Sequence, residues 1–191
     1  MKKLIITSLS ILCLQVFPVQ ANDNQPLVDQ AKTHIKTLAV ALKSTLQHGM
    51  KDDGAAASIK LCNIQAPLIT QASSAESGNS DWTISRTSLQ LRSPANAPKA
   101  WIEQVLKDFD DRKKQGEDVN AIAHSEIRDG QYYFVKAIPT QAGCLACHGS
   151  NVAVDVKAKL AELYPNDKAT GYSVGDIRGA FIASKPITAG E

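Results

Sequence analysis

The sequence has no surplus of charge of either sign. Of its 191 residues, 21 are Lys or Arg and 19 are Asp or Glu. Two of the basic residues, Lys2 and Lys3, lie in the N-terminal segment, so the rest of the chain carries both signs in equal number. Proteins that bind nucleic acid or anionic membranes usually have a basic surplus. The balance therefore indicates neither kind of partner.

Long hydrophobic runs are also missing beyond the N-terminus. The stretch from Leu4 to Phe17 is largely apolar, follows two lysines and precedes Ala21, as in a secretory signal peptide. No later segment approaches the roughly 18 to 20 apolar residues of a membrane helix. We expect a signal peptide over residues 1–21, and a periplasmic or otherwise exported domain over 22–191 without a transmembrane segment. A lipidated Cys13 is the alternative, but bulky Leu12 and Leu14 flank it.

Sulfur-containing side chains are scarce. If Cys13 leaves with the signal peptide, three cysteines remain, Cys62, Cys144 and Cys147, and three cannot pair completely. Met50 is then the only methionine. A chain of this kind offers few soft ligands to a metal.

Two of these cysteines belong to the pattern C-x-x-C-H, formed by Cys144, Cys147 and His148. The pattern is typical of c-type haem attachment: two thiols one turn apart bind the haem covalently, and the adjacent histidine reaches the iron. We expect one covalent haem c with His148 as an axial ligand. Two alternatives are a redox-active Cys144–Cys147 pair and a Cys3His zinc site completed by Cys62.

Few side chains could supply the second axial ligand of the iron. The candidates besides cysteine are Met50, His34, His48 and His124. The position of each is typical of a surface or gap-filling side chain. Cys62 lies on the apolar face of an expected helix, so its position alone fits a buried thiol as well as a ligand. Water or an empty position is the remaining alternative.

The apolar spacing predicts helices and strands in an α+β order. Helices are expected from Val28 to Leu46, around Ile59 to Ile69 with Pro67 kinking or shortening the far end, from Lys99 to Gln115 and from Val154 to Tyr164. Gln71 to Ser80 is interpreted as a loop. Strands are expected over Trp82–Arg92, Ala121–Arg128, Gln131–Ile138 and Ile177–Ile187, with Asp129 and Gly130 forming a tight hairpin turn. Such an order favours an α+β domain around an antiparallel sheet.

Four stretches resemble one known family. They are Ile59 to Pro67 around Cys62, WTISRTSLQLRSPANAP (82–98), KAIPTQAGCLACHG (136–149) and ATGYSVGDIRGA (169–180). Together they resemble the PAS-like c-type haem domain, which occurs as exported single-domain proteins and as sensor regions of bacterial signalling proteins. Ser93 stands where that family has Asn.

The resemblance implies a PAS-like antiparallel sheet with N-terminal helices and additional flanking helices. It also implies that Cys62, in LCNIQAP, is the second axial ligand. A thiolate opposite histidine favours ferric iron, so we expect a low reduction potential. Arg86 and Arg92, with Arg178 as a further candidate, have the guanidinium groups that suit haem carboxylates.

The function expected from these residues is electron transfer to an unknown redox partner protein, or sensing of redox state or of a diatomic gas. An enzyme is the less favoured interpretation. A peroxidase-like reaction would need an open position at the iron and a distal acid–base group, for which His124 is the nominee.

Overall fold

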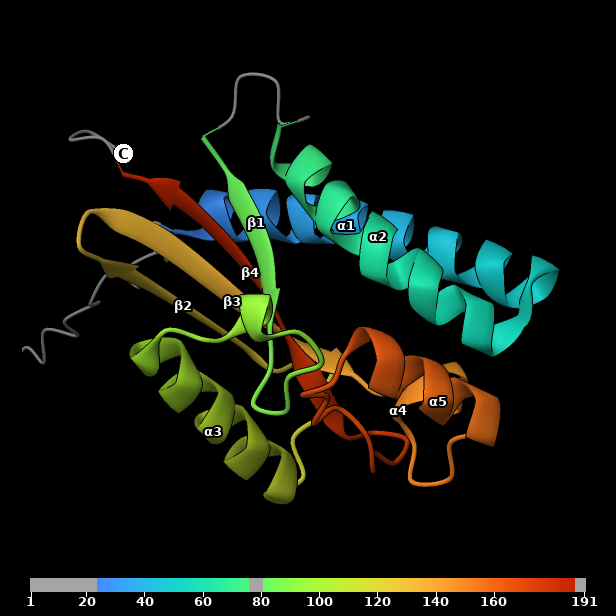
Figure 1. Cartoon of the computed structure of the whole chain (residues 1–191). Helices are drawn as coiled ribbons and strands as arrows, with labels where there is room; N and C mark the ends of the chain where they lie inside the picture. Colours follow the sequence, from blue (N-terminus) through green and yellow to red (C-terminus); the bar gives the residue numbers. More distant parts are fainter. Residues whose placement is uncertain (1–23, 76–80, 188–191) are drawn as a thin grey trace, which may run out of the picture.

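The computed structural model describes residues 24–75 and 81–187. The expected signal peptide, its cleavage site and Cys13 lie outside these residues. A four-stranded antiparallel sheet with strand order β1-β4-β3-β2 forms the centre, and helices lie on both of its faces (Figure 1). None of the described helices is long and apolar enough to cross a membrane. The arrangement confirms the α+β prediction and is consistent with a PAS-like fold.

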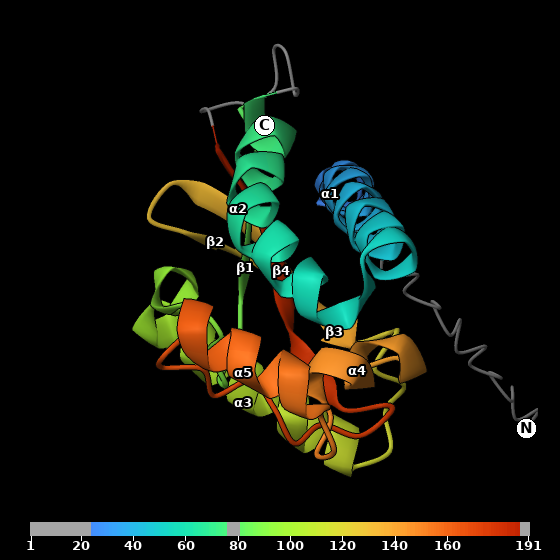
Figure 2. The same cartoon turned by 45° about the vertical axis from the view of Figure 1, so that its right-hand side comes forward.

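Two long helices form an N-terminal hairpin. Helix α1 (Gln25–Asp52) has Pro26 in its first turn and buries Ala31, Ile35 and Leu38 along one stripe, as predicted. A left-handed Gly54 (φ 82°) starts α2 (Gly54–Ala75), which carries Cys62. Figure 2 shows the two helices side by side.

The predicted shortening of α2 at Pro67 and the predicted start of a loop at Gln71 were wrong. The helix continues through Pro67 to Ala75, although proline removes one backbone hydrogen bond there. The end is held by Ser74, whose hydroxyl accepts from the Ile84 N–H (3.0 Å) and lies 3.2 Å from the Ile84 carbonyl oxygen. The small residues that suggested a loop therefore let the helix lie close to a strand.

The strands pair as a single antiparallel sheet. They are β1 (Thr83–Thr87), β2 (Ala123–Arg128), β3 (Gln131–Pro139) and β4 (Ile177–Pro186). Asp129 (φ 51°) and Gly130 (φ 72°) make the predicted hairpin turn between β2 and β3. Strand β1 is shorter than predicted, because the chain leaves the sheet after Thr87 and forms the short helix η1 (Pro94–Asn96).

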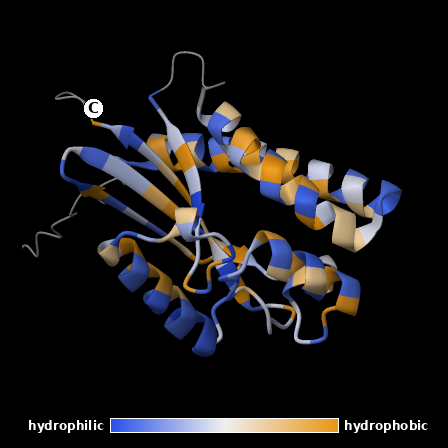
Figure 3. Ribbon diagram, in the orientation of Figure 1, coloured by the Kyte–Doolittle hydropathy of each residue, from blue (hydrophilic) through white to orange (hydrophobic). Residues whose placement is uncertain are grey.

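The two faces of the sheet bury different side chains. On one face Tyr132 and Phe134 of β3 pack with α1, and on the other Val135 and Ala137 pack with α3 (Ala100–Lys114). Apart from the residues that pack on the sheet, α3 is mainly hydrophilic (Figure 3). Helix α5 (Val154–Leu163) packs on α2 through a third cluster of Ile59, Val152, Val156 and Leu160. This third contact brings α2 beside the C-x-x-C-H segment.

Candidate functional site

The C-x-x-C-H residues lie on one short turn after β3. The turn consists of η2 (Ala142–Cys144) and α4 (Leu145–His148). Cys144 and Cys147 are half-buried, and both thiols are free. A Cβ atom at Gly149 would lie 2.7 Å from the Leu145 carbonyl oxygen, so the chain can leave the turn so closely only with glycine. Both thiols are thus placed on the same turn as His148, and the two cysteines are not joined as a redox disulfide.

The glycine-rich segment before β4 holds this turn at both ends. The Thr140 N–H donates to the Asp176 carbonyl at 2.7 Å, just before the turn. The Tyr172 N–H donates to the His148 carbonyl at 2.9 Å, at its end. The stretches 136–149 and 169–180, which are far apart in the sequence, therefore form one structural unit.

The ring of His148 is buried and oriented. Its Nδ1 lies 2.6 Å from the Ala169 carbonyl oxygen, while the Arg178 Nε lies 3.1 Å from Nδ1 and 3.4 Å from Nε2. Nδ1 cannot both donate to the carbonyl and accept from Arg178; the shorter contact to an acceptor places the proton on Nδ1. Burial, then Arg178 and Arg92, lower the pKa of His148 to about 3. The ring is neutral, with its lone pair on Nε2, as a metal ligand requires.

Cys62 approaches this turn from helix α2. Its thiol is half-buried, and its charge would interact with those of Cys147, Arg86 and Arg92. Burial raises the pKa of Cys62, whereas the two arginines oppose that rise. The structure therefore brings Cys62 and the C-x-x-C-H segment into one group.

Arg86 on β1 has no protein partner for one of its donors. Its Nε is buried and, among the described residues, makes no hydrogen bond. Burial lowers the pKa of Arg86, Arg178 lowers it further, and Cys62 and Tyr164 raise it. A buried guanidinium with a free donor beside a second buried cation favours an anion in contact with it.

Arg178, at the start of β4, lies across the group. Its guanidinium carbon is 5.5 Å from the ring centre of Tyr172, and its Nη1 donates to the Ser88 hydroxyl at 3.2 Å. The Tyr172 ring stands edge-on to His148, with centroids 6.3 Å apart. Burial lowers the pKa of Arg178. Arg178 is therefore a closer neighbour of His148 than the sequence analysis gave reason to expect.

Arg92 binds the protein itself. Its Nε and Nη2 each lie 3.2 Å from Oδ2 of Asp167, and Nη2 also donates to the carbonyls of Cys147 (2.5 Å) and Ala169 (3.3 Å). The sequence predicts a haem carboxylate as a partner of Arg92. In the structure Arg92 binds the Asp167 carboxylate, which could not be predicted because nothing in the run PNDK marks Asp167 as close to Arg92.

The zinc alternative finds no support in the described part of the chain. Within residues 24–75 and 81–187, no three His, Cys, Asp or Glu side chains are grouped as they would be around one metal ion. A Cys3His site needs four such ligands. A haem iron needs fewer protein ligands than zinc, and His148 and Cys62 are side chains of the kinds that bind it.

The comparison with known proteins agrees with this geometry. Residues 20–186 match the sequence model of the Tll0287-like family, which is well over half of the chain. The chain belongs to the Tll0287-like family. The crystal structure of the cyanobacterial heme-protein Tll0287 matches with a TM-score of 0.62 and 27% sequence identity, over 88% of this chain and 99% of that chain. No curated protein matches this chain.

In this member of the Tll0287-like family, the other histidines lie elsewhere. His34 on α1 faces Trp82, with ring centroids 5.6 Å apart, and His48 is exposed on the same helix. His124 lies on β2, the edge strand opposite β1, and its Nε2 is 3.1 Å from a Glu126 carboxylate oxygen. The residue nominated for peroxidase chemistry thus has Glu126 as a hydrogen-bond partner. Met50 is half-buried in the last turn of α1.

Two contributors to the site were not foreseen. The Ala169 carbonyl, which orients His148, is a main-chain group and leaves no signal in the sequence. Tyr164, at the end of α5, was interpreted only as a helix end before Pro165. It lies near Cys62 and Arg86, so its charge would interact with theirs.

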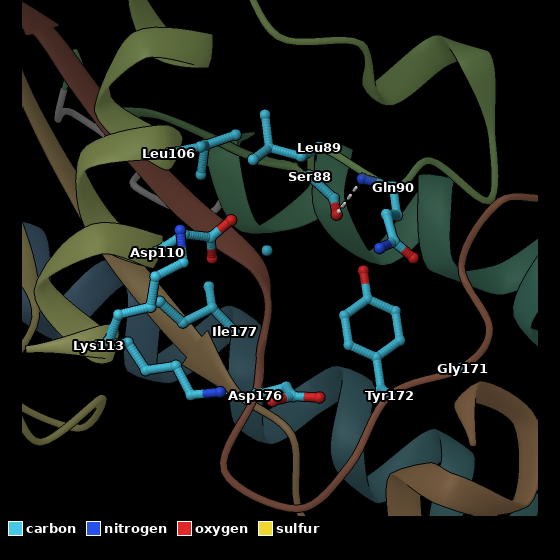
Figure 4. A pocket seen from close by; sticks show the side chains of 12 residues that line it. Ser88, Leu89, Gln90, Leu106, Asp110, Lys113, Gly171, Tyr172, Asp176 and Ile177 are labelled. Carbon is cyan, nitrogen blue, oxygen red and sulfur yellow. Dashed lines mark hydrogen bonds and ion pairs between the residues drawn. The ribbon is translucent and has the colours of Figure 1, made fainter. Parts of the chain in front are cut away.

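A separate pocket of about 250 Å³ lies beside Tyr172 (Figure 4). It is lined by α3, by residues 88–90 and by the glycine-rich segment, and the Tyr172 hydroxyl points toward Gln90. None of Cys62, Cys144, Cys147 and His148 lines it. Because the ligand-type side chains lie elsewhere, the candidate site is the group around His148.

Proposed function

We propose that this protein binds one haem covalently through Cys144 and Cys147, with His148 and Cys62 as the axial ligands of the iron. The observation that carries the proposal is the packing of α2, the helix of Cys62, on the cluster that also includes Cys147, so that the charges of the two thiols would interact. Membership of a family whose namesake is a heme-protein supports it independently.

The protein's own groups suit each part of such a cofactor. The Ala169 carbonyl holds Nδ1 of His148, so that Nε2 carries the lone pair for iron. The Arg86 Nε, which has no hydrogen-bond partner among the described residues, is available for a haem carboxylate, whereas Arg178 already donates through Nη1 to Ser88 and to the Gln90 carbonyl. Arg92 is largely engaged with Asp167, which leaves its Nη1 for the cofactor contact predicted from the sequence.

The haem would supply one-electron exchange between ferric and ferrous iron. We propose that the protein uses it for electron transfer with a redox partner protein, or for sensing redox state or a diatomic gas. The N-terminal segment supports export to the periplasm or beyond, where c-type attachment takes place. Cys62 opposite His148 supports a low reduction potential.

Intact mass of the exported product tests this proposal. The full chain is expressed with its own N-terminus in a bacterial host that assembles c-type cytochromes. We expect the mass of residues 22–191 plus one haem. A product with the mass of the bare processed polypeptide would contradict the proposal.

Absorption and EPR spectra of the same product test the ligand set. His148 with Cys62 predicts low-spin, six-coordinate ferric iron. A high-spin, water-bound ferric iron would contradict Cys62 as a ligand while leaving covalent attachment intact.

A further inference from the structure

We infer that Arg92, held by Asp167, is the residue that positions His148 and tunes its strength as an iron ligand. The inference rests on the proposed haem function and assigns to these two side chains a role in setting the reduction potential.

One nitrogen of Arg92, Nη2, contacts two carbonyl groups on either side of His148, those of Cys147 and Ala169. Its Nη2 donates to the carbonyl of Cys147, the residue before His148, at 2.5 Å. The same Nη2 lies 3.3 Å from the Ala169 carbonyl oxygen, which accepts the Nδ1–H of His148 at 2.6 Å. The main chain that carries the ring and the group that orients the ring are therefore held by a single cation.

Asp167 completes the arrangement from the other side. Its Oδ1 accepts from the Ala169 N–H at 2.8 Å, and its Oδ2 accepts from Arg92. The Lys168 N–H donates to the Leu91 carbonyl at 2.8 Å, so the main chains beside both charged residues are also joined. Ala169 cannot move without breaking bonds to both members of the pair.

The pair lies where charge acts strongly. The Arg92 and Asp167 side chains are only 14% and 10% exposed, so solvent screens them weakly. Arg92 competes with the His148 N–H for the lone pairs of the Ala169 carbonyl. A weaker bond at Nδ1 makes the imidazole a poorer electron donor to iron. The positive charge of Arg92 acts in the same direction, because it disfavours ferric iron.

Opposite charges therefore predict opposite shifts of the midpoint potential. Arg92→Gln should lower the potential of the holoprotein, and Asp167→Asn should raise it. The double variant should fall between the two and close to the unaltered protein. A purely structural role would instead move both single variants in the same direction, through a loosened site.

A matched control is available on α3. Arg112 and Glu117 form a similar two-bond pair, at 2.8 and 2.7 Å, and neither contacts the group around His148. Arg112→Gln removes the same charge, and we expect little change in the potential. A shift as large as that of Arg92→Gln would overturn the assignment, since the effect would then follow total charge.

A separate measurement tests whether Arg92 positions the His148 ring. Arg92→Lys keeps the charge but has no fork to span two carbonyls and Asp167. We expect a potential near that of the unaltered protein together with broadened or split low-spin ferric EPR signals, because the orientation of the imidazole plane sets the splitting of the iron d orbitals. An EPR spectrum identical to that of the unaltered protein would contradict the positioning role.

The outcomes separate this inference from the proposed function. If intact mass shows no covalent haem on the unaltered protein, the proposed function fails. If haem is attached but Arg92→Gln and Asp167→Asn shift the potential in the same direction or not at all, only the role of the pair fails. Should Arg92→Gln not accumulate as holoprotein, Asp167→Asn and Arg92→Lys decide the question.

Discussion

The two sides of the candidate site are held in different ways. On one side, His148 directly follows Cys147, its ring bonds to the Ala169 carbonyl, and its own carbonyl accepts from Tyr172. On the other side, Cys62 sits on a 22-residue helix and owes its place to the packing of α2 on α1, α5 and β1. The His148 side is fixed by short-range hydrogen bonds, and the Cys62 side by the docking of a helix.

This difference predicts that the position of Cys62 can change while the position of His148 does not. A helix held by apolar contacts can shift slightly when one packing residue changes, whereas a turn held by several backbone bonds resists such shifts. We therefore expect substitutions on α2 and α1 to alter ligation by Cys62 while His148 and the covalent attachment persist.

Removing both attachment thiols should break the His148 side completely. In Cys144→Ser with Cys147→Ser, no thioether can form, so no haem should remain on the polypeptide after extraction with acidified organic solvent. Cys62→Ser is the control and should keep its haem through the same extraction. Covalently retained haem in the double variant would show that attachment occurs elsewhere.

Removing Cys62 should change the iron without detaching the haem. In Cys62→Ala, we expect the ferric iron to lose its low-spin thiolate signature and the midpoint potential to rise on the order of 100 mV, because axial ligands control potential over a wide range. Absorption spectra, EPR and redox titration measure this. An unchanged ferric spectrum and potential would mean that Cys62 does not bind iron.

A bulky residue at the helix contact should disturb only the Cys62 side. A Cβ atom at Gly49 would lie 2.6 Å from Leu61 Cδ2 and 3.1 Å from Ser58 Oγ, so Gly49→Val should push α2 away from α1. We expect a loss of about 1–3 kcal/mol in the free energy of unfolding and mixed ligation in EPR spectra.

Gly143→Val is the comparison for that prediction. Gly143 lies next to Cys144, but a Cβ atom there would meet nothing within 4 Å. We expect a smaller loss of stability and unmixed ligation. If Gly143→Val disturbed ligation more than Gly49→Val, the turn rather than the helix contact would be the sensitive side.

The stability of the segment that holds the His148 turn should depend on pH through Asp176. The Asp176 carboxylate accepts from Lys113 Nζ (2.6 Å) and from the Ser173 N–H (2.7 Å), and these bonds lower its pKa below 3.8. A carboxyl whose folded pKa is depressed stabilises the fold above its unfolded pKa, and this contribution is lost as pH falls through the folded pKa.

Asp176→Asn should therefore be less stable at pH 7 by up to about 1 kcal/mol, since the side chain is about a third exposed and partly screened. The difference should shrink in denaturation curves recorded below pH 3. Asp108→Asn, at an exposed ion pair on α3, should change stability by less than about 0.5 kcal/mol at either pH. A constant difference for Asp176→Asn at both pH values would contradict the assignment.

Much of the fold could be predicted because its signals are local. The stripe of Ala31, Ile35 and Leu38 marks a helix, and the Asp129–Gly130 turn marks a hairpin. The errors arose where distant contacts override local preference. Pro67 and the small residues after it suggested an end to α2, but Ser74 binds β1 and the helix runs to Ala75.

The same division applies to the site. Cys144, Cys147 and His148 are adjacent in the chain, so their pattern could be interpreted without a structure. Arg92 could be selected as a guanidinium near the site, but its partner Asp167 could not be predicted, because Asp167 reaches it only through folding.

The amino-acid sequence by itself determined the C-x-x-C-H pattern and the α+β order of elements, since both depend on residues a few positions apart. Tertiary structure decided that Arg178 lies against the His148 ring, that Cys62 lies near Arg86 and Cys147, and that a main-chain carbonyl orients the ring. The physical reason is that these contacts join α2, β1 and β4 through buried packing and hydrogen bonds whose partners no local pattern specifies.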